Sequence, residues 1–409
     1  MPSTIQTPSP IAACRPPAAV VRPHWVRATV LAASLALVVV ALEAIFYFAG
    51  IGDQEYLRPD ATTGYSPMAG KHVTWRKEGF SRAVFNSWGM RDRELTIEKP
   101  RDTFRIAFLG DSFVEALQVE RERSFVARVE AMLNERGYRP RVEAMNFGVS
   151  AYNLGQMHLR LKDLAVRFQP DLVVVCLRSD TTLLLAPNPQ GGFIYARPTF
   201  FVGTGRGVVA DYTVQSLFYR SGEGKRMRRL GWLREHSRIW GVVSNSVAYL
   251  VSEYGDDWDR LQSFARSFLK SGRLSAPELA PPAAVFANPI DQENLRKATL
   301  YLWPTADALL QAMTDDCARH GSHVAFLRLP GQNGQHNLLE ASLMKRSAER
   351  LHVPYIDLNP AFAAATTAER NLFFTFHMDD FGHELAAREL SNALQDRHLV
   401  PDAAESGEK

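Results

Sequence analysis

The stretch Arg105-Ile-Ala-Phe-Leu-Gly110-Asp111-Ser112-Phe113 joins a short apolar run to Gly-Asp-Ser, and a helical pattern follows it. This order predicts a buried strand that ends just before Ser112, at the amide-rich start of a helix. Ligands of open α/β sheets bind at the carboxyl ends of strands, and a helix start favours negative charge. Ser112 is therefore a candidate nucleophile. The alternative is an ordinary strand-to-helix turn in which Ser or Asp is the cap.

Predicted strands and helices alternate on both sides of a long interruption. In chain order they are strand 105–109, helix 123–136, strand 142–147, helix 153–168, strand 171–177, helix 305–320, strand 323–329, strand 353–358 and helix 381–395. Strands that are apolar on both faces and alternate with helices predict a parallel sheet in a three-layer α/β/α sandwich. Right-handed crossovers gather the strand ends at one edge. Ser112, Gly148 and Ser179 each follow a strand, so we expect them to meet there.

Four stretches of the chain together resemble the four sequence blocks of the SGNH (GDSL-type) hydrolases. They are Gly110-Asp111-Ser112, Asn146-Phe-Gly148-Val-Ser150-Ala-Tyr152, Pro170 to Asp180, and His377-Met-Asp-Asp-Phe-Gly382-His383. Upstream, Asn86-Ser-Trp-Gly89-Met-Arg91-Asp92 resembles the segment before the first block in bacterial, membrane-anchored members. The resemblance covers residues 80–180 and 297–397 and implies the flavodoxin-like SGNH fold.

The resemblance also implies a mechanism. Ser112 is the expected nucleophile and His377 the base that removes its proton, while His383 has a packing or capping role at the helix start. The backbone amides of Ser112 and Gly148 are the expected oxyanion donors, together with a side chain from the third block. The family has asparagine at that last position, where this chain has Ser179.

A second departure concerns the group that orients the histidine. Family members usually carry Asp two or three residues before it, where this chain has Thr375 and Phe374. Replacing the triad Asp with Asn in a serine protease lowers kcat about 10⁴-fold. The sequence leaves two alternatives: a Ser-His dyad whose imidazole is held by the Thr375 hydroxyl or a backbone carbonyl, or an approach of Asp379 or Asp380. Asp111 is expected to brace its turn, and Asp357 to be structural.

The apolar run at residues 28–51 is long enough to cross a bilayer. A cleaved signal peptide is the alternative, but the run is long for one and has no clear small-x-small cleavage site. Arg15, Arg22 and Arg27 precede it without an acidic residue, and positive flanks stay in the cytoplasm. We therefore expect a single-pass anchor in the cell inner membrane, with the C-terminal domain in the periplasm or at the extracellular face.

The composition excludes several other classes of protein. The chain has 409 residues with a net charge of +3, and no stretch interleaves aromatic and basic residues as nucleic-acid-binding proteins do. Cys14, Cys176 and Cys317 give no disulfide framework, and Cys176 is expected to be inert inside its strand. No CxxC or His-rich spacing indicates a metal site, so we expect neither metal nor cofactor.

Residues 181–296 interrupt the alternation and are expected to form a mainly helical insertion. Lys225-Arg226-Met-Arg228-Arg229 lies within it. One interpretation is a solvated cap over the active-site rim; the other is a basic amphipathic surface that contacts anionic lipid or an acidic polysaccharide. The predicted organisation is a disordered cytoplasmic tail at 1–27, an anchor at 28–51, a connector at 52–102 with Trp75 and Trp88 packed on the domain, an SGNH hydrolase-like domain at 103–397 and a disordered tail at 398–409.

The sequence thus predicts a membrane-anchored, envelope-facing serine esterase. Its expected substrates are acyl esters, acetyl esters above all, of a carbohydrate or a lipid. Two other functions stay open. In the first, the chain is an O-acyltransferase that acts on an exopolysaccharide, with a sugar hydroxyl in place of water. In the second, it is a catalytically lapsed hydrolase that serves as a carbohydrate-binding or scaffold protein.

Overall fold

The computed structural model describes residues 24–52, 55–76, 78–137, 140–178, 185–186, 193–204, 207–244, 246, 292–331, 338–366 and 372–401. The chain divides into two units, Met1–Gly50 and Ile51–Lys409. In the first unit, α1 (His24–Ala49) is a helix of 26 residues with a mean hydropathy of 2.4 in its most apolar window. Its length and composition would suit either an uncleaved anchor or a signal sequence.

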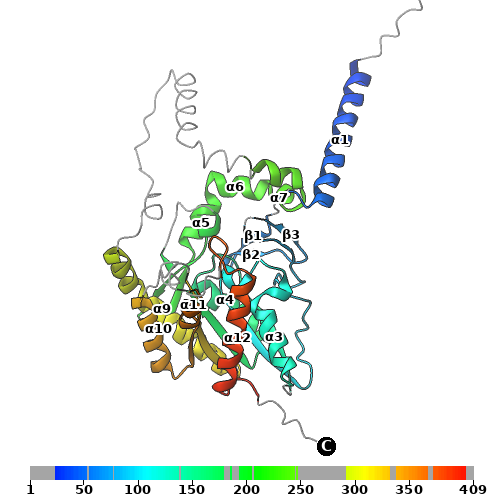
Figure 1. Ribbon diagram of the computed structural model, residues 1–409. Helices are drawn as coiled ribbons and strands as arrows, with labels where there is room; N and C mark the ends of the chain where they lie inside the picture. The colour runs from blue at the N-terminus through cyan, green and yellow to red at the C-terminus, as the bar shows by residue number, and fades with distance from the viewer. Residues whose placement is uncertain are drawn as a thin grey trace, which may run out of the picture. The chain divides into compact units, whose positions relative to one another are not determined.

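The second unit is built on a parallel sheet of five strands in the order β11-β10-β7-β5-β6 (Figure 1). The strands are β5 (Thr103–Leu109), β6 (Arg141–Asn146), β7 (Leu172–Leu177), β10 (His323–Arg328) and β11 (Tyr355–Asp357). The first of these strands in the chain lies between the second and the third. This 2-1-3-4-5 order is that of the flavodoxin-like doubly wound sheet, so the predicted fold class is confirmed.

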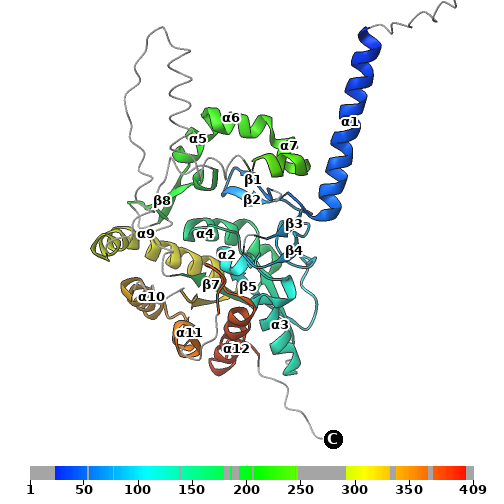
Figure 2. The ribbon, with the colours of Figure 1, turned by 45° about the horizontal axis from the view of Figure 1, so that its top comes forward.

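Helices cover both faces of the sheet (Figures 1 and 2). One face packs against α3 (Phe125–Glu135), α11 (Asn359–Thr366) and α12 (Asp380–Asp396), and the other against α4 (Leu154–Asp163), α9 (Gln292–Arg319) and α10 (Leu338–Leu351). Alternate residues of β5 face opposite sides: Ile106 and Phe108 join the first core, and Ala107 and Leu109 join the second. This alternation follows from the two-residue period of a strand.

The predicted helices and strands of the sandwich are confirmed to within a few residues, apart from one boundary. Helix α9 begins at Gln292, whereas the sequence predicts a start at residue 305. The helix continues through Pro304, although proline is usually unfavourable inside a helix. The sequence analysis also missed α10 and α11. Short 3₁₀ turns complete the second unit, namely η1 (Arg121–Arg123), η2 (Ala165–Phe168) and η4 (Phe193–Tyr195).

The segment expected to be a polar connector contains two antiparallel hairpins. They consist of β1 (Leu57–Asp60) with β2 (Gly64–Pro67), and β3 (His72–Trp75) with β4 (Ser81–Val84). Trp75, the last residue of β3, packs on a small cluster that includes Phe85, and Trp88 packs edge-on against Phe168. Both tryptophans therefore pack on the domain, as predicted.

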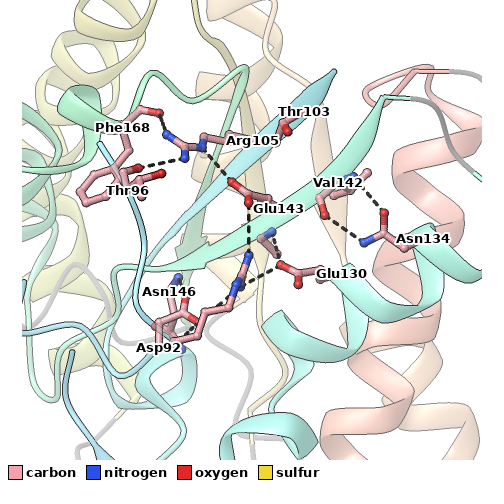
Figure 3. Close-up of polar contacts among 12 residues, drawn as sticks. Asp92, Thr96, Thr103, Arg105, Glu130, Asn134, Val142, Glu143, Asn146 and Phe168 are labelled. Atoms are coloured by element: carbon pink, nitrogen blue, oxygen red, sulfur yellow. Dashed lines mark hydrogen bonds and ion pairs between the residues drawn. The ribbon is translucent and has the colours of Figure 1, made fainter. Parts of the chain in front are cut away.

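Buried charged groups fasten this N-terminal segment to the sheet (Figure 3). The guanidinium of Arg105 on β5 is fully buried; it pairs with Glu143 at 3.0 Å and donates to the carbonyl oxygens of Thr96 and Phe168. Arg91, also buried, donates to the carbonyl of Glu115 at 3.0 Å. Removing one partner of a buried pair typically costs about 3–5 kcal/mol. The segment is thus an integral part of the second unit.

The described part of the insertion contains the helices α5 (Thr213–Arg220), α6 (Gly222–Arg229) and α7 (Gly231–His236), and residues 238–244 are helical as well. This confirms a helical insertion. A hairpin of β8 (Thr199–Val202) and β9 (Val208–Asp211), which the sequence analysis did not predict, precedes them. The Pro-Ala stretch at 276–284 lies outside the described residues.

Candidate active site

Ser112 is the first residue of a four-residue helix, α2 (Ser112–Glu115), at the carboxyl end of the central strand β5. The side chain of Asp111 caps this helix by accepting a hydrogen bond from the amide of Phe113 at 3.0 Å, which is the bracing role expected for it. A Cβ on Gly110 would lie 2.2 Å from the side chain of Val114, so only glycine fits there. The tight turn leaves the Ser112 hydroxyl at the edge of the sheet.

His377 lies on the loop that precedes α12, and its Nε2 is 2.8 Å from the Ser112 Oγ. The loop is closed by a bridge between Phe373 and Met378 and by the amide of Phe374, which donates to the His377 carbonyl at 2.8 Å. This is the contact that a general base needs in order to remove the serine proton. The first and fourth sequence blocks therefore meet in space.

The other ring nitrogen of His377, Nδ1, hydrogen-bonds to the Oε2 of Glu78. Glu78 lies on the loop between β3 and β4, and its side chain is about as buried as that of His377, with 14% and 15% exposed respectively. A carboxylate at Nδ1 fixes the tautomer and orientation of the imidazole and stabilises the imidazolium when it forms. Ser112, His377 and Glu78 thus form a continuous chain of hydrogen bonds.

The serine follows the first strand of a 2-1-3-4-5 sheet, and the histidine precedes the last helix. The sheet order is flavodoxin-like, and the positions of the serine and the histidine are those that the resemblance to SGNH hydrolases implies. No family model matches the sequence, and no curated protein matches it. Among solved structures, it is similar to the acetyl xylan esterase AlAXEase, with 13% identity over 71% of this chain and 100% of that one (TM-score 0.35).

Two other solved structures found by the comparison are similar to a comparable extent. One is Axe2, an acetylxylan esterase from Geobacillus stearothermophilus, with 11% identity over 73% of this chain and 96% of that one (TM-score 0.32). The other is TesA, with 13% identity over 71% of this chain and 98% of that one (TM-score 0.35).

The sequence lacks the aspartate that usually orients the histidine in this family, but in the structure Glu78 lies beside Nδ1 of His377. Thr375, the expected substitute, is exposed, and Glu78 already occupies Nδ1 of the histidine. Asp379 accepts from the amide of Gly382 as the cap of α12, and Asp380 pairs with Arg128. Each of these carboxylates therefore has a structural role.

A glycine explains how Glu78 comes so close to the histidine loop. Gly79 has φ +63°, and a Cβ on it would lie 2.2 Å from the Gln118 carbonyl oxygen and 2.7 Å from the ring of Phe374. The loop is then held by the amide of Phe80, which donates to the same Gln118 carbonyl at 3.1 Å. Only a residue without a side chain lets the hairpin pack this closely on the loop that carries the base.

The imidazole of His383 and the carboxylate of Asp357 have structural roles, as the sequence predicts. His383 is buried, and its Nδ1 accepts from the amide of Phe125 at 3.2 Å; burial lowers the pKa of its imidazole to about 3. Asp357 pairs with Arg328 at 3.1 Å. These two groups are therefore separate from the Ser112–His377–Glu78 chain.

The two remaining predicted site residues are Gly148 and Ser179. The N–H of Gly148 donates to the Oδ1 of Asn146 at 2.9 Å, and a Cβ on Gly148 would lie 2.4 Å from the amide of Glu115. The second block therefore packs directly against α2. An oxyanion bound by the Gly148 amide would have to accept the same N–H that now donates to the side chain of Asn146. Ser179 lies outside the described residues. The oxyanion roles of both residues remain predictions.

Arg178, at the end of the third sequence block, lies against both the Ser112 turn and the His377 loop. Its guanidinium carbon is 4.6 Å from the centre of the Phe113 ring and 4.7 Å from that of Phe376, and its Nε is 3.5 Å from Asp111 Oδ2. The same two rings lie 5.1 and 4.9 Å from the His377 ring. The positively charged guanidinium of Arg178 and the imidazole of His377 therefore contact the same two aromatic rings.

Glu115, three residues after Ser112, is fully buried beneath this edge. Its Oε2 accepts hydrogen bonds from the amide of Ser150 at 2.9 Å and from the Tyr56 hydroxyl at 3.1 Å. Burial raises the pKa of its carboxyl to about 7, because the charged form loses its hydration. Glu115 thus joins the first block, the second block and the N-terminal segment.

Among the described residues no three His, Cys, Asp or Glu side chains are grouped as metal ligands would be. Cys176 and Cys317 are buried, free thiols, and burial raises the pKa of Cys317 to about 12. Neither thiol reaches the thiolate form readily, so the serine is the nucleophile that the geometry offers.

Proposed function

We propose that this chain is a membrane-anchored serine esterase that cleaves acyl esters, acetyl esters above all, outside the cytoplasm. The observation that carries the proposal is the hydrogen-bond chain from Ser112 through His377 to Glu78. A lapsed hydrolase would have no use for a buried carboxylate aligned on the far nitrogen of the histidine. The complete triad therefore supports an enzyme over a binding or scaffold protein.

The reaction begins when His377 Nε2 takes the proton of Ser112 as its Oγ attacks the ester carbonyl carbon. The tetrahedral intermediate collapses, the ester C–O bond breaks, and His377 gives its proton to the departing alcohol. Water then attacks the acyl-serine while His377 takes its proton, the bond between the acyl carbon and Ser112 Oγ breaks, and the acid is released as His377 returns the proton to Oγ. Glu78 stabilises the imidazolium in both halves of this cycle.

The negative charge of the tetrahedral intermediate needs donors that are already in place. The Ser112 amide at the start of α2 is the first, and Gly148 and Ser179 remain the candidates that the sequence resemblance implies. Arg178 provides a further positive charge beside the same edge, held by Phe113 and Phe376. In this proposal Arg178 compensates for the missing asparagine of the third block.

The Arg178 role can be measured with two substitutions. Removing one oxyanion donor typically lowers kcat about 10²- to 10³-fold, so Arg178→Gln should fall in that range while KM changes little. Arg178→Lys keeps the charge and should recover part of the rate. The matched control is Arg388→Gln on the exposed side of α12. An unchanged kcat for Arg178→Gln would remove this residue from the mechanism.

The function itself is tested with the full-length protein in detergent. A fluorophosphonate should label the wild type at Ser112 and should not label Ser112→Ala, whereas Ser342→Ala on α10 should label normally. Hydrolysis of p-nitrophenyl acetate should follow the same pattern. If the folded wild type neither labels nor turns over, the chain is not a serine hydrolase. Products formed with an added sugar acceptor distinguish hydrolysis from acyl transfer, because only transfer yields an acylated sugar.

The membrane part of the proposal rests on α1, with the charge bias of its flanks. A periplasm-dependent reporter fused after residue 409 should be active, and a cytoplasm-dependent reporter at the same place should be inactive. The opposite pattern would reverse the proposed orientation. Release of a shortened, soluble protein would instead identify α1 as a cleaved signal sequence.

A further inference from the structure

The helices of the insertion carry a local excess of positive charge. Residues 213–244 contain seven Arg or Lys and two Glu, a net charge of +5, whereas the whole chain has a net charge of +3. The basic residues are Arg220, Lys225, Arg226, Arg228, Arg229, Arg234 and Arg238. The rest of the chain is therefore slightly acidic, and its positive field is concentrated on this segment.

Exposed apolar side chains lie among these charges. Leu217, Trp232 and Val243 are 59%, 71% and 50% exposed, and Lys225 and Arg226 are exposed on α6 between them. In Figures 1 and 2, α5, α6 and α7 lie together on the side of β1 and β2, away from α12. Basic and apolar residues exposed on the same short helices are typical of elements that lie in a membrane interface.

The end of this helical segment is fixed beside the residue at which the second unit begins. Arg238 is buried, and its Nη1 donates to the carbonyl oxygen of Ile51 at 3.4 Å. Gly52 has φ +84°, and a Cβ on it would lie 2.7 Å from the Arg238 carbonyl oxygen. Lys71 adds a hydrogen bond to the carbonyl of Glu235 at the end of α7. These contacts all lie within the second unit.

The contact between Arg238 and Ile51 indicates where α7 lies relative to the membrane, because Ile51 lies just after the end of α1. Ile51 is separated from the last residue of α1 by Gly50 alone, so it lies at the surface of any bilayer that α1 crosses. Since Arg238 contacts Ile51, α7 and its exposed Trp232 must lie close to the lipid headgroups. Tryptophan is enriched at this depth of a membrane.

We propose that α5, α6 and α7 form a membrane-contact surface that binds anionic phospholipid headgroups through Lys225, Arg226 and Arg229, with Trp232 at the interface. The inference rests on the membrane-spanning role of α1 in the proposed function. Seven basic residues against two acidic ones complement a negatively charged lipid surface. The surface would hold the catalytic unit in one orientation on the bilayer, where α1 alone is a single flexible point of attachment.

The test uses the full-length protein with Cys14→Ser and Trp232→Cys, labelled with an NBD fluorophore, because Cys176 and Cys317 are buried. It is reconstituted into vesicles of phosphatidylcholine, with or without phosphatidylglycerol. We expect the NBD emission to move to the blue and to be quenched by brominated lipids when phosphatidylglycerol is present. The quenching should fall several-fold in neutral vesicles and at high salt.

Charge reversal provides the matched pair of variants. Arg226→Glu with Arg229→Glu should reduce the quenching several-fold, whereas Lys345→Glu with Arg346→Glu, exposed on α10, should leave it unchanged. Melting temperature and fluorophosphonate labelling at Ser112 are followed in the same samples, because they report folding and the proposed esterase site independently. Loss of labelling with normal quenching would contradict the esterase and leave the surface intact.

Three results would overturn the proposal. In the first, the label stays unquenched in phosphatidylglycerol vesicles although the protein resists alkaline extraction; the anchor then holds, but the surface does not contact lipid. In the second, the protein is extracted, so α1 does not span the membrane. In the third, soluble polygalacturonate displaces the label from the vesicles, and the surface is then a binding site for acidic polysaccharide.

Discussion

The turn that carries Ser112 and the loop that carries Glu78 reach His377 from opposite sides, and they are held in different ways. The Ser112 turn grows out of β5, the central strand, with a large core on each face. The Glu78 loop joins the strands of a two-stranded hairpin over a small cluster that includes Val73 and Phe85. A two-stranded hairpin has little stability of its own.

The Ser112 turn and the Glu78 loop should therefore differ in their stability against local opening. Opening the sheet edge at Ser112 requires the core to come apart, whereas opening the β3–β4 hairpin breaks few buried contacts. Local opening occurs first where buried contacts are few. The hairpin can therefore open, and Glu78 leave the histidine, while Ser112 and His377 stay together.

The largest expected effect on kcat comes from substitutions of Ser112 and His377. Ser112→Ala or His377→Ala should lower kcat for p-nitrophenyl acetate by about 10⁶-fold, and the double substitution should cost little more, because nucleophile and base act as a unit. The melting temperature should stay near that of the wild type. Additive losses in the double variant would contradict a shared mechanism.

The next effect is on the hairpin side. Glu78→Gln keeps a hydrogen-bond partner at Nδ1 but loses the charge, so we expect kcat to fall about 10⁴-fold. Fluorophosphonate labelling of Ser112 should slow in parallel, and the melting temperature is followed to show that the variant is folded. Glu122→Gln, at an exposed position on η1, is the control. Full activity in Glu78→Gln would show that Glu78 does not orient the base.

The stability of the second unit should depend on pH through Glu115, which joins the Ser112 turn to Ser150 and Tyr56. Burial raises the pKa of its carboxyl from 4.5 to about 7, so the folded chain keeps a proton that the unfolded chain loses. This contribution to stability is complete below pH 4.5 and is lost as the pH rises through 7. Over pH 5 to 8 the loss amounts to about 2–3 kcal/mol.

Urea unfolding at the two pH values measures this contribution. Glu115→Gln should lose about 2–3 kcal/mol less than the wild type on going from pH 5 to pH 8. Asp92, whose pKa burial raises to about 6, remains in both proteins and cancels in the comparison. Equal pH dependence in both proteins would mean that Glu115 does not titrate as its burial implies.

The smallest effect is expected at Thr375. With Glu78 already on Nδ1, Thr375→Asp should leave kcat within a few-fold of the wild type. In the Glu78→Gln background the same substitution should restore part of the rate. A large gain in the wild-type background would contradict the triad, because it would mean that the imidazole lacks an orienting carboxylate.

Local patterns in the sequence predict the sheet, Ser112 and His377. A strand, a glycine and a helix start are adjacent in the chain, so their periodicity and order suffice to place the serine. His377 was found by resemblance, from its short distance to Gly382 and His383. The alternation of strands and helices predicts a parallel sheet, whereas its flavodoxin-like order was implied by the resemblance alone.

Glu78 could not be predicted in this way, because it is 299 residues from the histidine that it contacts. It lies in a polar segment with several other acidic residues, and no spacing marks it out. The one local signal is the glycine that follows it, and glycine is ordinary in a hairpin loop. The start of α9 was also missed, because the helix continues upstream through Pro304, where proline is usually unfavourable.

The distance between Glu78 and His377 has a consequence for the synthesis of the protein. The carboxylate is made early and the base late, and at about 5–20 residues per second the ribosome needs about 15–60 s to add the 299 residues between them. The emerging chain cannot acylate Ser112 during this interval, because it has no base. In the proposed enzyme, the site is therefore complete only after His377 has been made and α12 has packed on the sheet.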